Sequence, residues 1–451
     1  MTNINRSNLP SIENCTICIV GLGYVGLPLA IEFSKIKTCL RTGNKLNRNI
    51  IGFDLYQKRI EELKSGVDIT KETEEKDLNE FKYINFTSDL NKISTADVYI
   101  ISVPTPIDID KNPDLNCLEK ATESIGEIIK KRKQPTTPLI IYESTVYPGT
   151  TEEICVPILE EKSGLKFNEG FFCGYSPERI NPGDKEHRLT SVVKVTSGSS
   201  EIAAKWIDSL YGSIISAGTY PAKSIQVAEA AKVIENTQRD LNIALINELA
   251  KIFKTLNIDT LDVLETAGSK WNFMPFRPGL VGGHCISVDP FYLTYKAKQH
   301  GYEPNIVLAG RNLNDGMSEW IVEQLLIAMQ GKKITQKIAK VLILGLTFKE
   351  NCPDTRNSKV MDIIFYLNQN GLTPYVYDPY IKNKIHVENN FIFLENLPTD
   401  GSTKFDAIII SVAHKEFKLI DINEWRNLMN KNNIIYDLKG ILPRELNPMR
   451  L

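Results

Sequence analysis

A thiol and a carboxylate stand four residues apart at the end of a glycine-rich stretch. Residues 276–290 read F-R-P-G-L-V-G-G-H-C-I-S-V-D-P, so three glycines lead to Cys285 and then to Asp289. Glycine lacks a Cβ, which lets such a loop turn tightly and approach a ligand closely. A cysteine on this loop, with an acid nearby, could act as a nucleophile. A small buried cysteine in a glycine-rich loop would give the same pattern, so the elements around it must decide.

The N-terminal region reads as a strand, a glycine turn and a helix. Residues 16–33 hold an apolar strand, then G-L-G-Y-V-G from Gly21, then an apolar helix. This is the context in which G-x-G-x-x-G binds a dinucleotide. Gly21 makes the turn, Gly23 lets the backbone reach the pyrophosphate, and Gly26 packs helix against strand. A second strand ends at Asp54, which we expect to accept hydrogen bonds from the ribose and to favour NAD over NADP.

Further apolar strands alternate with helical stretches. Residues 98–103, 139–142 and 171–175 are strand-length apolar runs, and this alternation predicts a parallel, doubly wound sheet. Ligands bind at the carboxyl ends of such strands, and Thr105, Thr145 and Glu178 lie just beyond three of them. Thr145 could equally be a simple turn hydroxyl.

One long helix is predicted over residues 220–257, which contain no internal glycine and are rich in Ala, Ile, Leu and Glu. Glu229, Lys232, Asn236 and Arg239 are three or four residues apart and so share one face. That face could simply be solvated. However, apolar residues flank Lys232, which favours a buried stripe in an active site.

The α/β pattern returns in the C-terminal third. Strands are predicted at residues 341–346, 374–377, 405–412 and 434–439, with a helix at 358–369. This half lacks G-x-G-x-x-G and offers Lys349 and Arg356 instead, cations that could bind a diphosphate. The predicted fold class is therefore α/β: two Rossmann-like, doubly wound parallel-sheet domains joined by a long central helix.

Composition narrows the partners. A net charge of −2 gives no reason to expect a nucleic-acid or membrane partner, and the apolar runs are too short to span a bilayer. Eight cysteines without a framework fit a reducing compartment, so we expect a cytoplasmic protein. Cys15 and Cys18 form C-x-x-C, but they lead into a strand, which argues against a redox or zinc role. The histidines show no ligand spacing, so no metal site is predicted.

Ordered motifs over nearly the whole chain resemble the UDP-sugar 6-dehydrogenase family. Besides the glycine fingerprint, they are V-P-T-P at 103–106, S-T-V-Y-P-G-T at 144–150, S-P-E-R-I-N-P-G at 176–183, Lys232 with Asn236, G-G-H-C-I-S-V-D-P at 282–290, G-L-T-F-K-E-N at 345–351 and D-T-R at 354–356.

The segment 270–279 resembles the branch acting on UDP-N-acetylglucosamine or UDP-N-acetylgalactosamine, which includes the Vi-antigen pathway enzyme. UDP-glucose enzymes carry an arginine near Ser269 and a second acid near Pro182, and both are missing here. UDP-N-acetylmannosamine enzymes have H-P-R where Lys270 and Trp271 stand.

The resemblance implies three domains and a reaction. Residues 1–218 would bind NAD, 219–330 would form a helical linker that carries the cysteine loop and builds a homodimer or higher oligomer, and 331–451 would bind the UDP-sugar. The reaction would be a four-electron oxidation of the sugar C6 alcohol to a carboxylate with two NAD⁺, supplying surface-polysaccharide precursors.

The resemblance also implies residue roles. Cys285 would form a thiohemiacetal and then a thioester, and Lys232 with Asn236 would stabilise the C6 oxyanion. Asp289 would orient Lys232 or a water, Thr145 would position a water, and Glu178 would assist hydrolysis or thiol activation. The implied cofactor contacts are Gly21, Gly23, Tyr24, Val25, Gly26, Asp54, Arg59, Thr105, Thr145 and Arg356. The implied substrate contacts are Arg179, Ile180, Lys232, Asn236, Arg239, Arg277, Gly279, Arg311 and Lys349.

Three alternatives stay open. UDP-glucose or UDP-N-acetylmannosamine could be the substrate. A β-hydroxyacid dehydrogenase shares the fingerprint and a helix with Lys and Asn, but it needs neither the cysteine nor a second α/β domain. A catalytically silent NAD-binding regulator is a different class, and the intact Cys285, Lys232 and Asp289 argue against it.

Overall fold

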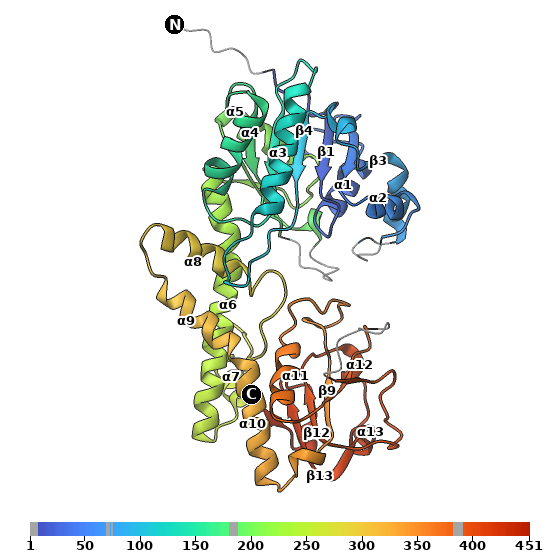
Figure 1. Cartoon of the computed structure of the whole chain (residues 1–451), viewed down its shortest axis with the longest axis vertical. Coiled ribbons are helices and arrows are strands. Elements are labelled where there is room, and N and C mark those ends of the chain that lie inside the picture. Colours follow the sequence, from blue (N-terminus) through green and yellow to red (C-terminus); the bar gives the residue numbers. More distant parts are fainter. Residues whose placement is uncertain (1–7, 69–72, 74, 180–187, 382–390) are drawn as a thin grey trace. The chain divides into compact units, whose positions relative to one another are not determined.

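The computed structural model describes residues 8–68, 73, 75–179, 188–381 and 391–451. The chain divides into two compact units, shown in Figure 1. The first unit contains residues 1–235 and 291–302, and the second contains 236–290 and 303–451. The central helical region, which the sequence assigned to a domain of its own, is divided between them.

The first unit is built on an eight-stranded sheet with the order β3-β2-β1-β4-β5-β6-β7-β8. All neighbouring strands are parallel except β6 and β7, which are antiparallel. The strand order reverses between β1 and β4, as in a doubly wound sheet. The strands are β1 Thr16–Val20, β2 Asn49–Phe53, β3 Ile84–Thr87, β4 Val98–Ile101, β5 Leu139–Tyr142, β6 Phe172–Tyr175, β7 Lys194–Gly198 and β8 Thr219–Pro221.

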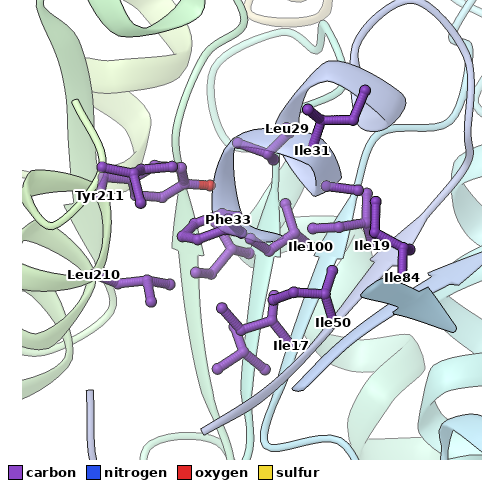
Figure 2. Close-up of a cluster of buried hydrophobic side chains, with 14 of the residues drawn as sticks. Ile17, Ile19, Leu29, Ile31, Phe33, Ile50, Ile84, Ile100, Leu210 and Tyr211 are labelled. Carbon is purple, nitrogen blue, oxygen red and sulfur yellow. The ribbon is translucent and has the colours of Figure 1, made fainter. Parts of the chain in front are cut away.

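Helices cover both faces of this sheet. On one face, α1 (Gly26–Lys35) and α5 (Glu201–Gly212) pack on the isoleucines of β1, β2 and β4, as Figure 2 shows. The rings of Phe33 and Tyr211 are 6.0 Å apart there. On the opposite face, α3 (Asn116–Lys131) places Thr122 against the Tyr142 hydroxyl at 3.2 Å. The remaining helices of this unit are α2 Gln57–Lys64, the π-helix Thr151–Cys155, α4 Val156–Ser163, and the short 3₁₀ segments Glu75–Tyr83, Leu90–Ile93 and Leu189–Ser191.

The predicted long helix is α6, which spans Ile225–Leu256 and passes from the first unit into the second. The predicted start at residue 220 was five residues too early. Residues 219–221 form the edge strand β8, which pairs with β7, so they are held extended by a neighbour that a local pattern does not reveal. The other central helices are α7 Thr260–Ala267, α8 Asp289–Gln299, α9 Asn305–Asp315 and α10 Met317–Gly331.

The second unit contains a six-stranded, all-parallel sheet with the order β11-β10-β9-β12-β13-β14. One face packs on α10 and α11 (Val360–Gln369), and the other on α12 (Lys415–Lys418) and α13 (Ile422–Asn427). The strands are β9 Val341–Leu344, β10 Tyr375–Tyr377, β11 Ile392–Phe393, β12 Phe405–Ile410, β13 Met429–Asp437 and β14 Met449–Arg450, with 3₁₀ segments Gln336–Ile338 and Arg444–Leu446. The predicted α/β class with two doubly wound sheets is confirmed.

None of the helices among the described residues has the length and apolar character needed to cross a membrane.

Candidate active site

The glycine turn after β1 has the geometry that a dinucleotide needs. Gly21 has φ +92°, and a Cβ there would lie 3.1 Å from the Ser102 carbonyl oxygen. Gly26 begins α1, and a Cβ there would lie 1.9 Å from the Gly21 oxygen, so only glycine fits. A Cβ on Gly23 would meet no protein atom within 4 Å. Packing therefore does not explain Gly23, whereas a pyrophosphate approaching the backbone does.

Asp54 and Arg59 brace this turn. Asp54 follows β2 and accepts hydrogen bonds from the backbone N–H groups of Leu22 at 2.9 Å and Tyr56 at 3.0 Å. The buried Arg59 donates to the Leu22 carbonyl at 3.0 Å and pairs with Asp68 at 2.8 Å. The backbone N–H and the carbonyl of Leu22 are thus both held by side chains. Tyr24 and Val25 complete the turn, and Val25 is the N-cap of α1.

The predicted strand-end residues of the first unit gather around backbone carbonyls. The Thr105 hydroxyl donates to the Thr145 carbonyl at 2.7 Å, and Tyr292 donates to the Thr105 carbonyl at 2.5 Å. Glu178 is buried on the loop after β6. Arg179 pairs with Glu235 at 2.5 Å, while Ile180 lies outside the described residues. The structure thus places Thr105, Thr145 and Glu178 at carboxyl ends of neighbouring strands, as predicted.

The polar stripe of α6 is buried at its N-terminal half. Glu229 is fully buried and accepts hydrogen bonds from the backbone N–H groups of Gly149 at 2.6 Å and Thr151 at 2.9 Å. Burial raises the pKa of Glu229 to about 7, against the opposing effect of these bonds. Lys232 is buried, Asn236 is half-buried and Arg239 is exposed. The Lys232 end of the stripe is therefore not a solvated face.

The cysteine loop lies in the second unit and leads into α8. The Cys285 carbonyl accepts from the N–H groups of Val288 at 3.1 Å and Asp289 at 2.8 Å, which closes a turn before the helix. Asp289 is buried and accepts a hydrogen bond of 2.6 Å from the Asn236 side chain. Two predicted active-site residues, Asn236 and Asp289, are thus in direct contact.

Cys285 differs from most cysteines of the chain in its exposure. It is half-buried and Cys117 is exposed, whereas the other six are buried. Burial raises the pKa of Cys15 to about 12 and also raises that of Cys18. Such thiols stay protonated and unreactive, so the C-x-x-C pair offers no nucleophile.

The glycines beside Cys285 have a packing role that the sequence did not reveal. A Cβ on Gly282 would lie 2.5 Å from the Asn357 carbonyl oxygen, and one on Gly283 would lie 2.8 Å from the Phe348 ring. Gly283 also donates its N–H to Asn357 at 3.1 Å. These two glycines therefore let the cysteine loop pack on residues 348–357, rather than only allowing a ligand to come near.

Asp354 connects that packed segment to its neighbours. It lies 3.5 Å from His284 and pairs with Arg356 at 2.6 Å. Burial opposes ionisation, yet the nearby His284 ring and the hydrogen bonds from Arg356 hold the pKa of Asp354 well below its usual range. Arg356, a predicted cofactor contact, thus lies in the second unit, whereas the other predicted cofactor contacts lie in the first.

A pocket of about 430 Å³ opens at the strand-order reversal between β9 and β12 of the second sheet. Its lining includes the predicted substrate contacts Arg277, Gly279 and Lys349. Residues just beyond β9 and β12, Thr347 and Ser411, also line it. Ligands bind at this position in open α/β sheets.

Further cations of this pocket were missed: Lys359, Lys418, Lys439 and Arg450. Lys439 lies two residues beyond β13, and its Nζ is 3.3 Å from the position of a Cβ on Gly279. Desolvation within the concave pocket lowers the pKa of Lys439, although the residue as a whole is solvent-exposed. Its place at the end of a predicted strand, residues 434–439, was the signal that could have found it.

Arg311 is part of a buried network instead of the pocket lining. It pairs with Asp240 and with Asp315, both at 2.5 Å. Asn314 donates to the same Asp240 carboxylate at 2.7 Å and accepts from Asn247 at 2.8 Å. Asn247 in turn holds both backbone groups of Gly279, which lines the pocket.

Models of one protein family match three consecutive parts of the chain. The NAD binding domain of the UDP-glucose/GDP-mannose dehydrogenase family matches residues 15–215, its central domain matches 226–316, and its UDP binding domain matches 342–444. The chain belongs to the UDP-glucose/GDP-mannose dehydrogenase family. The predicted family, the NAD cofactor and the assignment as an NAD-dependent oxidoreductase are thereby confirmed.

Relatives of this dehydrogenase extend over nearly its whole length. It is 53% identical over 440 residues to the UDP-N-acetyl-D-glucosamine 6-dehydrogenase of Pseudomonas aeruginosa, covering 98% of this chain and 100% of the relative. It is 52% identical to the enzyme of that name from Salmonella typhi, covering 98% and 99%. A UDP-D-ManNAc dehydrogenase from Pyrococcus horikoshii has a similar structure, with a TM-score of 0.82, 29% identity and coverage of 95% and 96%.

Proposed function

We propose that this dehydrogenase oxidises the C6 hydroxyl of UDP-N-acetylglucosamine, or of its C4 epimer UDP-N-acetylgalactosamine, to the uronate. One observation carries the proposal: a single loop in the second unit both lines the cationic pocket, through Arg277 and Gly279, and carries Cys285. A UDP-sugar held by its diphosphate is thus bound by the loop that supplies the thiol. Two relatives above 50% identity bear the name UDP-N-acetyl-D-glucosamine 6-dehydrogenase.

The pocket suits the diphosphate of a UDP-sugar. The pocket is lined by three cations, Arg277, Lys349 and Lys439, and by Gly279. A Cβ at Gly279 would lie 3.3 Å from the Lys439 Nζ, so glycine leaves room beside that cation. Charge-assisted hydrogen bonds from such groups are the strong contacts that phosphates receive in proteins. Arg179, Ile180 and Arg239 remain proposed contacts of the UDP-sugar. Arg311, whose charge is paired with Asp240 and Asp315, remains a substrate candidate by motif position only.

The first oxidation requires a group that stabilises negative charge on the C6 oxygen. Lys232 and Asn236, one turn apart on α6, are proposed for this role. Asp289 accepts one hydrogen of the Asn236 amide, which fixes the orientation of that side chain. NAD⁺ bound at the glycine turn supplies the hydride acceptor for both oxidations, with Asp54 and Arg59 bracing the turn and Thr105, Thr145 and Arg356 as further proposed contacts.

The second oxidation requires the thiol. The Cys285 thiolate adds to the aldehyde carbon and forms a thiohemiacetal, which becomes a thioester when its hydride is removed. Water then adds to the thioester carbon and the C–S bond breaks. Glu178 is proposed to assist this hydrolysis, and Thr145 to position the water.

A substrate panel tests the proposal. We expect two NADH and one uronate from each UDP-N-acetylglucosamine or UDP-N-acetylgalactosamine, with much lower kcat/KM for UDP-glucose and UDP-N-acetylmannosamine. Cys285→Ala should form no uronate while retaining slow aldehyde formation. Preference for UDP-glucose would overturn the substrate assignment, and normal uronate formation by Cys285→Ala would overturn covalent catalysis.

We also propose a cytoplasmic homodimer with the roles of residues 1–218, 219–330 and 331–451 given above. Leu245, Ile252 and Leu256 lie on one face of α6 and are 54%, 44% and 59% exposed. Contiguous exposed apolar residues mark interaction surfaces. Light scattering should give the mass of two chains for the wild type and of one chain for an Ile252→Glu variant. A monomeric wild type would refute the dimer.

A further inference from the structure

A lysine, a glutamate and a tyrosine form a buried cluster beneath the strand-end loops of the first unit. Lys194 begins β7, Glu143 follows β5, and Tyr211 belongs to α5; each is at most 3% exposed. The Lys194 Nζ is 2.7 Å from one Glu143 oxygen and 5.3 Å from the centre of the Tyr211 ring. The Tyr211 hydroxyl donates to the other Glu143 oxygen. The proposed reaction assigns these three residues no role.

Lys194 also reaches the loop that carries Glu178. Its Nζ donates to the Pro177 carbonyl at 3.1 Å. That oxygen belongs to the planar peptide unit joining Pro177 to Glu178, so anchoring it fixes the backbone nitrogen of Glu178. The proline ring also fixes the φ of Pro177 itself. The backbone position of Glu178 thus depends on the hydrogen bond that the Lys194 ammonium group donates.

Glu143 connects the ion pair to the neighbouring loop, which carries Thr145. It directly precedes Ser144 and Thr145. The Ser144 carbonyl accepts from Tyr175 at 3.2 Å, and the Thr145 carbonyl accepts from Thr105. The ion pair between Lys194 and Glu143 therefore joins the loop of Thr145 to the loop of Glu178.

A buried ion pair is a poor source of stability. Removing both charges from water is so unfavourable that apolar residues of similar size often stabilise a protein as well or better. The cluster is fully buried. Within it, the Lys194 ammonium donates one hydrogen bond to the Pro177 carbonyl, on a loop of the proposed active site. Burial, and then the charge of Glu143, raise the pKa of Tyr211 well above its usual value, so its phenol stays a donor. Such a network fixes geometry more than it adds stability.

We propose that Lys194 is a positioning residue for thioester hydrolysis, holding Glu178 in place for that step while both oxidations proceed without it. This inference rests on the proposed function, in which Glu178 assists hydrolysis. In that step water adds to the thioester carbon and the C–S bond breaks. The Cys285 thiolate and the uronate carboxylate are left, and the two protons of the water pass to the base and to solvent.

The test follows single turnovers of Lys194→Met with UDP-N-acetylglucosamine and NAD⁺. A burst of two NADH per active site should precede steady-state turnover at least tenfold slower than wild type, because a misplacement of about 1 Å can lower a rate by about 100-fold. Intact-protein mass spectrometry should show the sugar adduct on Cys285. The kcat/KM for the UDP-sugar should stay within about twofold of wild type, since the altered step follows binding and both oxidations, and KM should fall together with kcat.

A matched control removes another ion pair of the same unit, whose two side chains are 3% and 14% exposed. Arg132 pairs with Asp97 at 2.5 Å beside the amino end of β4, whereas the Lys194 cluster lies at carboxyl ends. Arg132→Met should turn over normally and show no adduct. If Lys194→Met does not fold, the Glu143→Gln/Lys194→Met double variant leaves no uncompensated buried charge, and it should show the same burst and adduct.

Several outcomes overturn the inference. These are wild-type turnover in Lys194→Met, loss of its NADH burst together with turnover, an equal adduct in Arg132→Met, or failure of both Lys194 variants to fold, because the cluster would then serve stability. Glu178→Gln separates a failure of the proposed role of Glu178 from a failure of the inference about Lys194. If it turns over normally, the proposed role of Glu178 fails and the inference fails with it. If it accumulates the adduct and the Lys194 variants do not, only the inference fails.

Discussion

Glu229 should make the stability of the first unit fall as pH rises towards neutrality. Its carboxyl is fully buried on α6, and burial raises its pKa from 4.5 to about 7 despite the two backbone N–H groups that donate to it. Between these two values the folded state binds more protons than the unfolded state, so the free energy of unfolding decreases with pH. The stabilisation from this group is fully present below pH 4.5 and is lost as pH passes about 7.

The size of the effect follows from the same two values. At about 1.4 kcal/mol per pKa unit, the difference between 4.5 and about 7 corresponds to roughly 3 kcal/mol. Glu229→Gln carries no charge at any pH. The difference in unfolding free energy, variant minus wild type, should therefore rise by roughly 3 kcal/mol across this interval. A constant offset from the altered hydrogen bonds does not change that slope.

Urea unfolding at a series of pH values measures this difference. Trp206 is the tryptophan of the first unit, so its fluorine NMR signal in fluorotryptophan-labelled protein reports on that unit. Glu127→Gln, at an exposed position on α3, is the matched control and should give a flat difference. A flat difference for Glu229→Gln as well would refute the reasoning.

Three further predictions concern the two ligand sites. Because Asp54 would face the ribose, kcat/KM with NAD⁺ should exceed that with NADP⁺ at least tenfold, and equal values would remove Asp54 from that role. Gly23→Ala should fold normally but bind NAD⁺ weakly, and unchanged NAD⁺ affinity measured by calorimetry would contradict this. Gly26→Ala should instead lose about 1–3 kcal/mol of stability through the close contact with Gly21. Asn247→Leu removes three hydrogen bonds, two of them to Gly279, which should lower the unfolding free energy by about 3 kcal/mol and weaken UDP binding; unchanged UDP affinity would mean that the loop is held for stability alone.

Features with local causes could be predicted from the sequence. The strand, glycine turn and helix around Gly21 follow from periodicity and from a backbone conformation that favours glycine, and the structure contains them. The burial of Lys232 followed from its apolar neighbours on a long helix. Both predictions depend only on residues within a few turns of each other.

Features set by distant partners could not be predicted in this way. Nothing near residue 194 encodes that β7 runs antiparallel to β6, and nothing near residue 220 encodes pairing with β7. Arg311 was assigned to substrate by motif position, yet its charge is paired with Asp240, 71 residues away. A buried arginine and an exposed one look alike until their partners are known. The packing role of Gly282 against Asn357 was hidden for the same reason.

The two sheets carry the same turn and use it differently. Gly21 and Gly345 have φ values of +92° and +90°, and each donates its N–H at 2.9 Å to the last residue of the neighbouring strand. Asp54 and Asp378 follow those strands and accept the N–H of Leu22 and Leu346, respectively.

The difference lies in what surrounds the acid and the turn. Asp54 is partly exposed, whereas Asp378 is 2% exposed and also binds the Thr347 N–H and His414. Thr347 and Glu350 stand where the first turn has Gly23 and Gly26, so side chains occupy the space that a pyrophosphate would need against the backbone. The next helix, α11, begins only at Val360. Because Thr347 and the buried Asp378 occupy the turn after β9, we expect this unit to bind phosphate through the side-chain cations of its pocket. A nucleoside diphosphate therefore suits the second sheet, and a dinucleotide suits the first.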